Sequence, residues 1–159
     1  METETKSLFR IVLVEPEIPQ NTGNIGRTCV GTNCELHIVG PMSFEINDTQ
    51  LKRAGLDYWQ HLKYFYYNSY EDWFKTVENK ERVFYFTTKT KKTYYEIAYQ
   101  PGDWMVFGKE TKGLSPEIIQ AHPNQSITIP QPGPVRSLNL ATAVAIGIYE
   151  GFRQLDFKK

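Results

Sequence analysis

The 159-residue sequence predicts an α/β fold, with a largely parallel six-stranded sheet and helices on both faces. Two observations support this fold class. Short runs rich in β-branched or aromatic residues alternate with segments that begin at helix-capping residues, as in repeated β–α units. Glycine- or proline-rich connections follow two of these runs, where open α/β sheets bind their ligands. The length fits one domain, residues 1–159, with a sizeable core but no room for a separate RNA-binding domain.

The first β–α unit begins with a strand at Phe9–Val14, a short β-branched run typical of a buried parallel strand. The segment 15–20 contains two prolines and is expected to continue neither regular element. Asn21 or Thr22 is therefore expected to cap a helix that runs to about Asn33.

Arg27 stands out within this helix. With a start at residue 21 or 22, it falls roughly one turn into the helix, where a cation opposes the helix dipole. A structural role at that position would be better served by an acidic residue. The position therefore indicates a functional role for Arg27.

The next units follow the same alternation. A strand is expected at Leu36–Val39 and a capped helix at about 47–54. The aromatic run Tyr64–Tyr67 fits a strand packed on the core better than a base-stacking surface, although the sequence leaves both open. Ser69 is expected to cap a helix that extends to about Asn79.

Three more strands are expected at Arg82–Phe86, Trp104–Phe107 and Gln125–Ile129. Ser115 begins a helix after the second of them, and Ser137 is expected to cap the final helix, which runs to roughly Phe152. Small residues keep one side of that final helix slim, so that it either packs closely on the sheet or associates with a second copy. They are Ala141, Ala143, Ala145 and Gly147.

The loop 108–115 is the most distinctive connection. Gly108 would let a ligand approach the backbone, Gly113 permits a positive φ, and Glu110 lies between them. A phosphate-binding P-loop is excluded, because Lys-Ser or Lys-Thr would have to follow the second glycine, and Leu114 stands there. The dinucleotide fingerprint G-x-G-x-x-G is absent from the sequence. The exit at Thr87–Lys89 is a second ligand-facing candidate.

The 18 basic and 18 acidic residues cancel, so any nucleic acid must be held by local patches. The candidates are Lys52-Arg53, Lys89 with Lys91-Lys92, Lys109 with Lys112, and Lys158-Lys159. Cys29 and Cys34 have neither metal-ligand nor disulfide spacing, and the three histidines lie far apart, so no metal is expected. No leader and no membrane-length apolar run is present, which predicts a cytoplasmic protein without a membrane partner.

Three segments, at 21–27, 107–114 and 136–141, together resemble the SPOUT superfamily of RNA methyltransferases: NTGNIGR, FGKETKGL and RSLNLA. Further matching stretches at 15–19, 53–58 and 86–89 extend the resemblance over nearly the whole chain, most closely to the small single-domain TrmL (YibK-type) tRNA methyltransferases. The resemblance implies a deep C-terminal trefoil knot over roughly 82–159, a feature that general topology rules would exclude.

The same resemblance implies a bent S-adenosylmethionine among three loops. The matching cofactor positions are Phe86, Thr87, Gly108, Glu110, Ile129, Ser137 and Leu138. Arg27 matches the family's essential arginine, expected to fix phosphate and stabilise an alkoxide, and Asn21, Glu110 and Asn139 match positions that shape the catalytic site. The resemblance does not identify the general base.

The implied reaction is 2′-O-methylation of the wobble nucleotide, cytidine 34 or a modified uridine 34, in the anticodon stem-loop of leucine tRNAs by a homodimer. The loop 131–135 departs from these relatives, which leaves the nucleotide preference open. Two alternatives are a ribosomal-RNA 2′-O-methyltransferase of the same superfamily, which usually carries an added RNA-binding domain, and a non-catalytic nucleotide- or RNA-binding module. The presence of Arg27, Glu110, Ser137 and Asn139 argues against the second.

Overall fold

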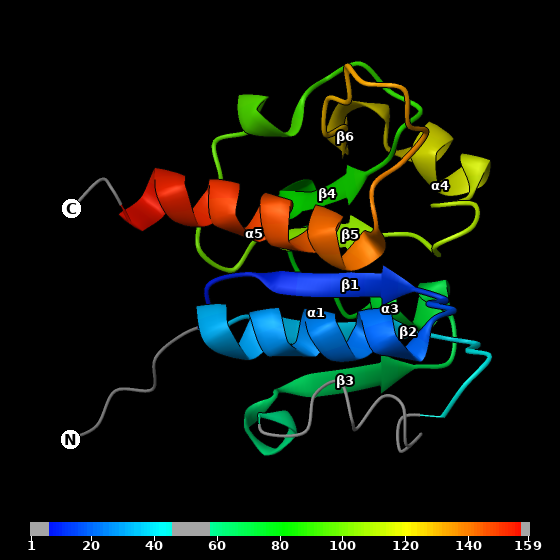
Figure 1. Cartoon of the computed structure of the whole chain (residues 1–159), viewed down its shortest axis with the longest axis vertical. Helices are drawn as coiled ribbons and strands as arrows, with labels where there is room; N and C mark the ends of the chain where they lie inside the picture. The colour runs from blue at the N-terminus through cyan, green and yellow to red at the C-terminus, as the bar shows by residue number, and fades with distance from the viewer. Residues whose placement is uncertain (1–6, 46–57, 157–159) are drawn as a thin grey trace.

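A six-stranded sheet with the order β3-β2-β1-β5-β4-β6 forms the centre of the computed structural model, which describes residues 7–45 and 58–156. Every neighbouring pair of strands is parallel, so the six carboxyl ends meet at one edge (Figure 1). The strands are β1 (Arg10–Val14), β2 (Glu35–Val39), β3 (Tyr64–Tyr67), β4 (Val83–Phe86), β5 (Trp104–Phe107) and β6 (Ser126–Ile127). The predicted α/β class with a parallel six-stranded sheet is confirmed. The aromatic run forms strand β3, but Tyr64, Phe65 and Tyr66 are exposed and not packed in the core as expected.

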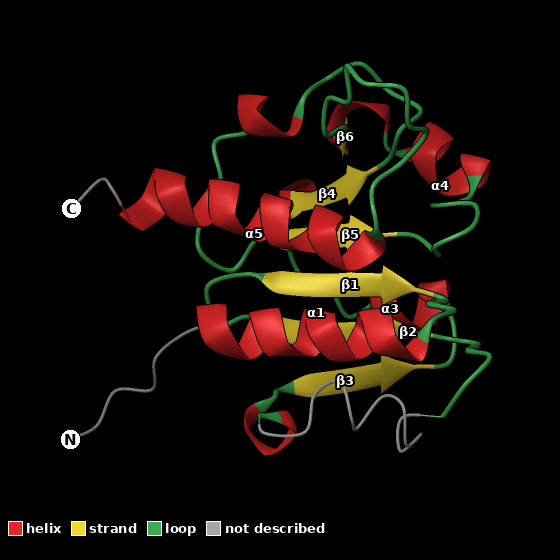
Figure 2. Cartoon of the chain, viewed as in Figure 1, coloured by secondary structure: helices red, strands yellow, loops and turns green. Residues whose placement is uncertain are grey.

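Helices cover both faces of this sheet (Figure 2). On one face lie α1 (Pro19–Thr32) and α5 (Leu140–Asp156), side by side across β1 (Figure 1). On the other lie α3 (Tyr70–Phe74) and α4 (Pro116–Ala121). Short 3-10 turns connect these elements: η1 (Trp59–His61), η2 (Lys80–Arg82), η3 (Tyr94–Glu96) and η4 (Pro123–Gln125).

The side chains of successive β1 residues pack alternately into two separate hydrophobic cores. Ile11 and Leu13 belong to the core beneath α1 and α5, whereas Val12 and Val14 belong to the core on the face of α3, where Trp73 is fully buried. Burial on both faces explains why β1 is a continuous apolar run rather than an alternating one.

The structure corrects the start of α1. The helix begins at Pro19, with Ile18 at the N-cap, so neither Asn21 nor Thr22 is the cap. Proline is tolerated in the first turn because the first backbone N–H groups have no intrahelical partner. Arg27 therefore lies more than two turns into the helix. The dipole acts mainly on the first turn, so the electrostatic argument for a functional Arg27 is wrong.

The start of α5 also differs from the prediction. Asn139, not Ser137, is the cap: its Oδ1 accepts the N–H of Thr142 at 3.3 Å, and the helix begins at Leu140 and continues to Asp156. Ser137 lies instead in the exposed loop before the helix. One glycine on the slim side supports the packing alternative, because a Cβ at Gly147 would lie 3.0 Å from the ring of Phe86.

Other expected boundaries were only partly correct. Ser69 caps α3 by accepting the N–H of Asp72 at 3.1 Å, but the helix ends at Phe74 instead of Asn79. Asn79 instead caps η2. The helix expected at 47–54, like the pairs Lys52-Arg53 and Lys158-Lys159, lies outside the described residues.

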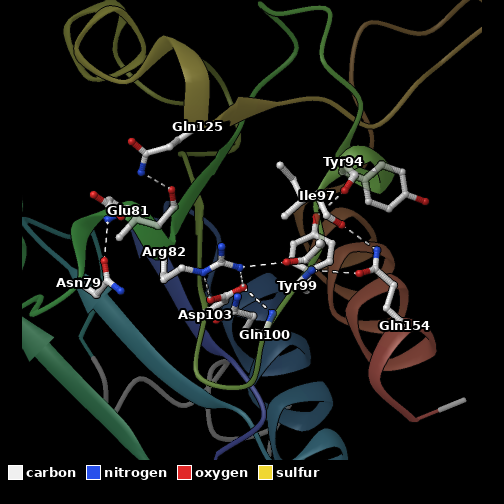
Figure 3. Close-up of polar contacts among 12 residues, drawn as sticks. Asn79, Glu81, Arg82, Tyr94, Ile97, Tyr99, Gln100, Asp103, Gln125 and Gln154 are labelled. Atoms are coloured by element: carbon white, nitrogen blue, oxygen red, sulfur yellow. Dashed lines mark hydrogen bonds and ion pairs between the residues drawn. The ribbon is translucent and has the colours of Figure 1, made fainter. Parts of the chain in front are cut away.

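A group of polar contacts lies at the edge of the sheet where the strands begin (Figure 3). Asp103, only 1% exposed, accepts from Arg82 Nε at 2.8 Å and from the Gln100 N–H at 2.8 Å. Gln154 of α5 accepts the N–H of Tyr99 and donates to the carbonyl of Ile97, both at 3.0 Å. These bonds tie α5 and the loop before β5 to the sheet, opposite the edge where the strands end.

Candidate active site

A cavity of about 390 Å³ lies at the carboxyl edge, between the loops that follow β4, β5 and β6. Every residue expected to hold the cofactor lines it: Phe86, Thr87, Gly108, Glu110, Ile129, Ser137 and Leu138. These residues come from three separate stretches of chain, and the parallel topology brings them together because each stretch leaves a strand at the same edge.

Two aromatic rings at the ends of neighbouring strands form the apolar part of the lining. Phe86 and Phe107 stack with ring centroids 4.4 Å apart and an interplanar angle of 19°. Both are buried, and α5 approaches them closely at Gly147. The cavity therefore combines a rigid aromatic wall with polar loops, the composition common to small-molecule sites.

The glycine loop after β5 folds back on itself. Lys109 and Gly113 form an antiparallel bridge, with the Gly113 N–H 2.8 Å from the Lys109 carbonyl oxygen, and Gly113 has a φ of 68°. A Cβ at Gly108 would overlap the backbone of Gly113 and Leu114. The structure thus gives a reason for Gly108 that differs from the expected ligand approach: the turn itself leaves no space for a side chain.

Glu110 fastens this loop to the entry of α1. Its carboxylate accepts the backbone N–H of Glu17 at 2.8 Å and that of Ile18 at 2.9 Å. An anion is favourable there, because the first N–H groups of a helix lack partners and carry the positive end of its dipole. In return, Glu17 accepts the N–H and the hydroxyl of Thr111 at 3.0 and 2.9 Å, and these bonds lower the pKa of Glu17.

Three of the four expected catalytic residues form one hydrogen-bonded line. Asn139 Nδ2 donates to Asn21 Oδ1 at 3.1 Å, and Asn21 Nδ2 donates to Glu110 Oε2 at 3.2 Å. Asn21 is 7% exposed, whereas Asn139 is exposed at the start of α5. The line connects the entries of α1 and α5 to the cavity loop, so these side chains are held in fixed orientations.

Arg27 does not join this group. It is exposed on α1, with its Cζ 5.1 Å from the centroid of the Tyr58 ring, and it does not line the cavity. It lies eight residues beyond Pro19, about 12 Å along the helix at 1.5 Å per residue.

The cavity is also lined by polar residues that the sequence did not mark as cofactor positions: Thr88, Lys89, Lys109, Thr111, Lys112, Thr128, Gln131 and Arg136. Gln131 carries a buried Oε1 with no hydrogen-bond partner among the described residues. A signal existed for Arg136, because it directly precedes Ser137, and for Thr88 and Lys89, because they follow Thr87 at a strand end. Thr128 and Gln131 both follow the short strand β6. Thr128 was expected to be part of that strand, and Gln131 could not be distinguished from an ordinary loop residue.

The described part of the chain holds no group of three or more His, Cys, Asp or Glu side chains placed to bind a metal. Burial raises the pKa of both cysteine thiols, Cys29 and Cys34, which are free. Within residues 7–45 and 58–156, no helix has the length and apolar character needed to span a bilayer.

Comparison with known proteins places this geometry in a family. Residues 8–149 match the SpoU rRNA Methylase family. The chain is 41% identical over 156 residues to the tRNA (cytidine(34)-2'-O)-methyltransferase of Burkholderia pseudomallei strain 1106a, which covers 95% of this chain and 98% of that protein. An enzyme of the same name from Escherichia coli K12 is 44% identical over 151 residues, covering 94% and 96%.

Solved structures agree with this result. One that describes the 2-OH methylation of C/U34 on tRNA has a TM-score of 0.90 and 40% identity, covering 94% of this chain and 97% of the other. The SpoU methyltransferase AviRb of Streptomyces viridochromogenes, in complex with AdoMet, shares the fold at a TM-score of 0.80 and 21% identity, covering 95% and 59%. The chain therefore belongs to the SpoU rRNA methylase family.

Proposed function

We propose that this protein transfers the methyl group of S-adenosylmethionine to the 2′-hydroxyl of the wobble nucleotide of tRNA, cytidine 34 or a modified uridine 34, with leucine tRNAs as substrates. The observation that carries the proposal is the convergence of all seven expected cofactor residues on one cavity. Two relatives more than 40% identical over nearly their whole length are named for this reaction at cytidine 34.

The cavity fits the cofactor in size and in chemistry. Its volume of about 390 Å³ falls within the range of roughly 300–1,000 Å³ typical of small-molecule sites. The Phe86 and Phe107 rings offer an apolar wall, and loop backbone groups offer donors and acceptors. S-Adenosylmethionine supplies, when bound, a methyl group made electrophilic by its sulfonium.

The line from Asn139 through Asn21 to Glu110 orients the polar groups beside the cavity. In-line attack by a ribose oxygen requires the substrate to be held within a narrow range of positions, and fixed side chains reduce the entropy cost of this alignment. Arg27 is proposed to fix a phosphate and to stabilise the developing alkoxide, because a guanidinium keeps its charge and forms two parallel hydrogen bonds.

The position of Arg27, away from the cavity of its own chain, supports a homodimer. This residue does not line that cavity, so contact with the reacting atoms needs the cavity of a second copy to face it. The outer side of α5 exposes Tyr149 (52%) and Phe152 (38%), with ring centroids 5.9 Å apart. Tyr149→Glu should give monomers in sedimentation, whereas Tyr95→Glu, at an exposed tyrosine of η3, should not. A monomeric unmodified protein at micromolar concentration would contradict the homodimer.

The trefoil knot and the single domain over 1–159 are part of the proposal. The packing of three loops of the segment 82–159 around one cavity is consistent with a knot. If the folded chain is knotted, joining its ends by ligation and then denaturing it should give a ring that migrates differently from a ring closed in denaturant. Identical migration would exclude a knot. The buried free thiols and a tRNA substrate support action in the cytoplasm.

The decisive experiment is methyl transfer from labelled S-adenosylmethionine to total RNA, both tRNA and ribosomal RNA, of a strain that lacks the wobble 2′-O-methyltransferase, followed by mapping of the labelled nucleotide. Label at ribose 34 of leucine tRNAs is expected. Label in ribosomal RNA would favour the alternative rRNA enzyme, and cofactor binding without transfer to any RNA would favour a binding module.

A further inference from the structure

The side chains that line the cavity carry more positive than negative charge. Among the described residues, four cations line it, Lys89, Lys109, Lys112 and Arg136, but only one carboxylate does, that of Glu110. The chain as a whole has a formal net charge of zero. Positive charge is therefore concentrated at this edge of the sheet, although the composition gives no sign of it.

Three of these cations have no protein partner in the described residues. Lys109 is paired with Glu15 at 3.4 Å. The side chains of Lys89, Lys112 and Arg136 form neither a hydrogen bond nor an ion pair there, and all three residues are exposed. Lys112 acts on Glu17 only at longer range, where it contributes to the lowered pKa of that carboxyl group.

The single carboxylate of the lining does not compensate for them. Both oxygens of Glu110 already accept hydrogen bonds from the entry of α1. The proposed cofactor does not compensate either, because its sulfonium and ammonium groups outweigh its one carboxylate by a positive charge. Like charges that face the same cavity repel, so this arrangement favours a further ligand that is an anion.

We propose that Lys89, Lys112 and Arg136 bind the backbone phosphates on either side of the target ribose. This inference rests on the proposed function. A ribose whose 2′-hydroxyl approaches the methyl donor brings its own phosphate and that of the next nucleotide to the mouth of the cavity. Two of the cations follow β4 and β5, and Arg136 precedes α5, so they surround that mouth from three loops. They act as positioning residues, and the hydroxyl is aligned through its flanking phosphates.

The test compares the unmodified protein with the triple variant Lys89→Gln, Lys112→Gln and Arg136→Gln. Binding of an anticodon stem-loop RNA is measured at several salt concentrations in the presence of S-adenosylhomocysteine. The slope of log K against log salt should fall by about 0.7 for each single-stranded phosphate that is no longer neutralised. The triple variant no longer neutralises the two flanking phosphates, so it should lose roughly 1.4. Its affinity for S-adenosylhomocysteine should stay within about twofold of the unmodified protein.

A second RNA separates phosphate binding from a general effect of charge. Neutral methylphosphonate linkages on both sides of nucleotide 34 should weaken binding to the unmodified protein but have little further effect on the triple variant. Lys63→Gln is the matched control, because Lys63 is an exposed cation just before β3 that lies outside the cavity lining. It should leave the slope unchanged.

An unchanged slope in the triple variant would overturn the proposal, and so would a larger loss of cofactor affinity than of RNA affinity. If the triple variant does not fold, the single variants give the same test, and each should lose part of that slope, at most about 0.7. Failure of the proposed function is separate: the unmodified protein would then bind RNA without methylating any tRNA.

Discussion

Glu17 and Glu110 bind each other's loops, although they are 93 residues apart in the sequence. Glu110 Oε1 accepts the backbone N–H of Glu17 at 2.8 Å, and Glu17 Oε1 accepts the backbone N–H of Thr111 at 3.0 Å. The exchange joins the entry of α1 to the glycine loop of the cavity. Any change that frees one of these segments is therefore expected to affect both helix stability and ligand binding.

Glu110→Gln tests this connection. An amide keeps the shape of the side chain but removes the charge and one acceptor, so the N–H groups of Glu17 and Ile18 can no longer both bond to it as they do now. Loss of charge-assisted hydrogen bonds of this kind costs on the order of 1–3 kcal/mol. Urea denaturation should show that loss, and calorimetry should show weaker S-adenosylhomocysteine binding.

Glu78→Gln is the matched control, because Glu78 is exposed and its side chain has no hydrogen-bond partner among the described residues. This substitution should change neither the stability in urea nor the affinity for S-adenosylhomocysteine. Equal stability of the Glu110→Gln and Glu78→Gln proteins would show that the bonds to the α1 entry contribute little.

Gly108→Ala should disrupt the cavity loop with a single methyl group. A Cβ at this position would overlap the backbone of Gly113 and Leu114, and backbone cannot move aside as a flexible side chain can. We expect a lower melting temperature and a loss of cofactor affinity of tenfold or more. Gly133→Ala, in the neighbouring proline-rich loop, meets open space and should be tolerated. Unchanged cofactor binding by the Gly108→Ala protein would contradict this account of the turn.

Much of the sheet could be predicted, because strands that are buried on both faces leave a recognisable local pattern in the sequence. Runs such as 10–14 and 104–107 have no exposed face, so they contain neither the alternation of a surface strand nor the period of a helix. Glycine and proline then mark where each strand ends. Because the carboxyl ends of parallel strands share an edge, the loops around Phe86, Gly108 and Ile129 could be expected to meet.

The helix starts could not be predicted in the same way, because distant residues determine them. Ile18 carries no capping side chain, and the carboxylate of Glu110 satisfies its N–H from 92 residues away. Ser137 was the expected cap for α5, but Asn139 is the residue that caps it. Asn139 holds that position while its amide also bonds to Asn21, 118 residues away. Contacts of this kind leave no local pattern in the sequence.

The buried His37 should make stability depend on pH. Its Nε2 lies 2.8 Å from Glu35 Oε1 and its Nδ1 lies 2.8 Å from the Tyr67 hydroxyl. Burial, opposed by Glu35 and assisted by Arg10, lowers the pKa of His37 to about 4 from its ordinary 6.5. Below pH 6.5 the unfolded chain binds a proton that the folded chain does not, so the stability present above pH 6.5 falls as the pH drops toward 4.

A shift of one pKa unit corresponds to about 1.4 kcal/mol. The free energy of unfolding should therefore fall by an amount on the order of 3 kcal/mol as the pH drops from 6.5 to 4. Urea denaturation at a series of pH values should show a shallower decline for His37→Gln than for the unmodified protein. His61→Gln, at an exposed histidine, should keep the full decline. Parallel curves for the two variants would mean that His37 titrates normally in the folded state.

Arg27 provides the test that separates an enzyme from a binding module. The side chain is exposed, its Cζ lies 5.1 Å from the centroid of the Tyr58 ring, and it does not line the cavity of its own chain. Arg27→Ala should therefore leave the fold and S-adenosylhomocysteine affinity nearly intact. Methyl transfer to tRNA should fall by several orders of magnitude, because the positive charge proposed to stabilise the developing alkoxide is lost.

Arg27→Lys should restore little activity, since an ammonium provides a point charge without the planar pair of donors that a guanidinium offers to phosphate. Lys63→Ala is the control, because Lys63 is an exposed cation just before β3 whose side chain forms no ion pair with the described residues. Single-turnover rates at saturating cofactor measure the effect directly. Near-parental transfer by the Arg27→Ala protein would refute a catalytic role, whereas joint loss of cofactor binding and stability would show that the contact between Arg27 and Tyr58 serves the fold.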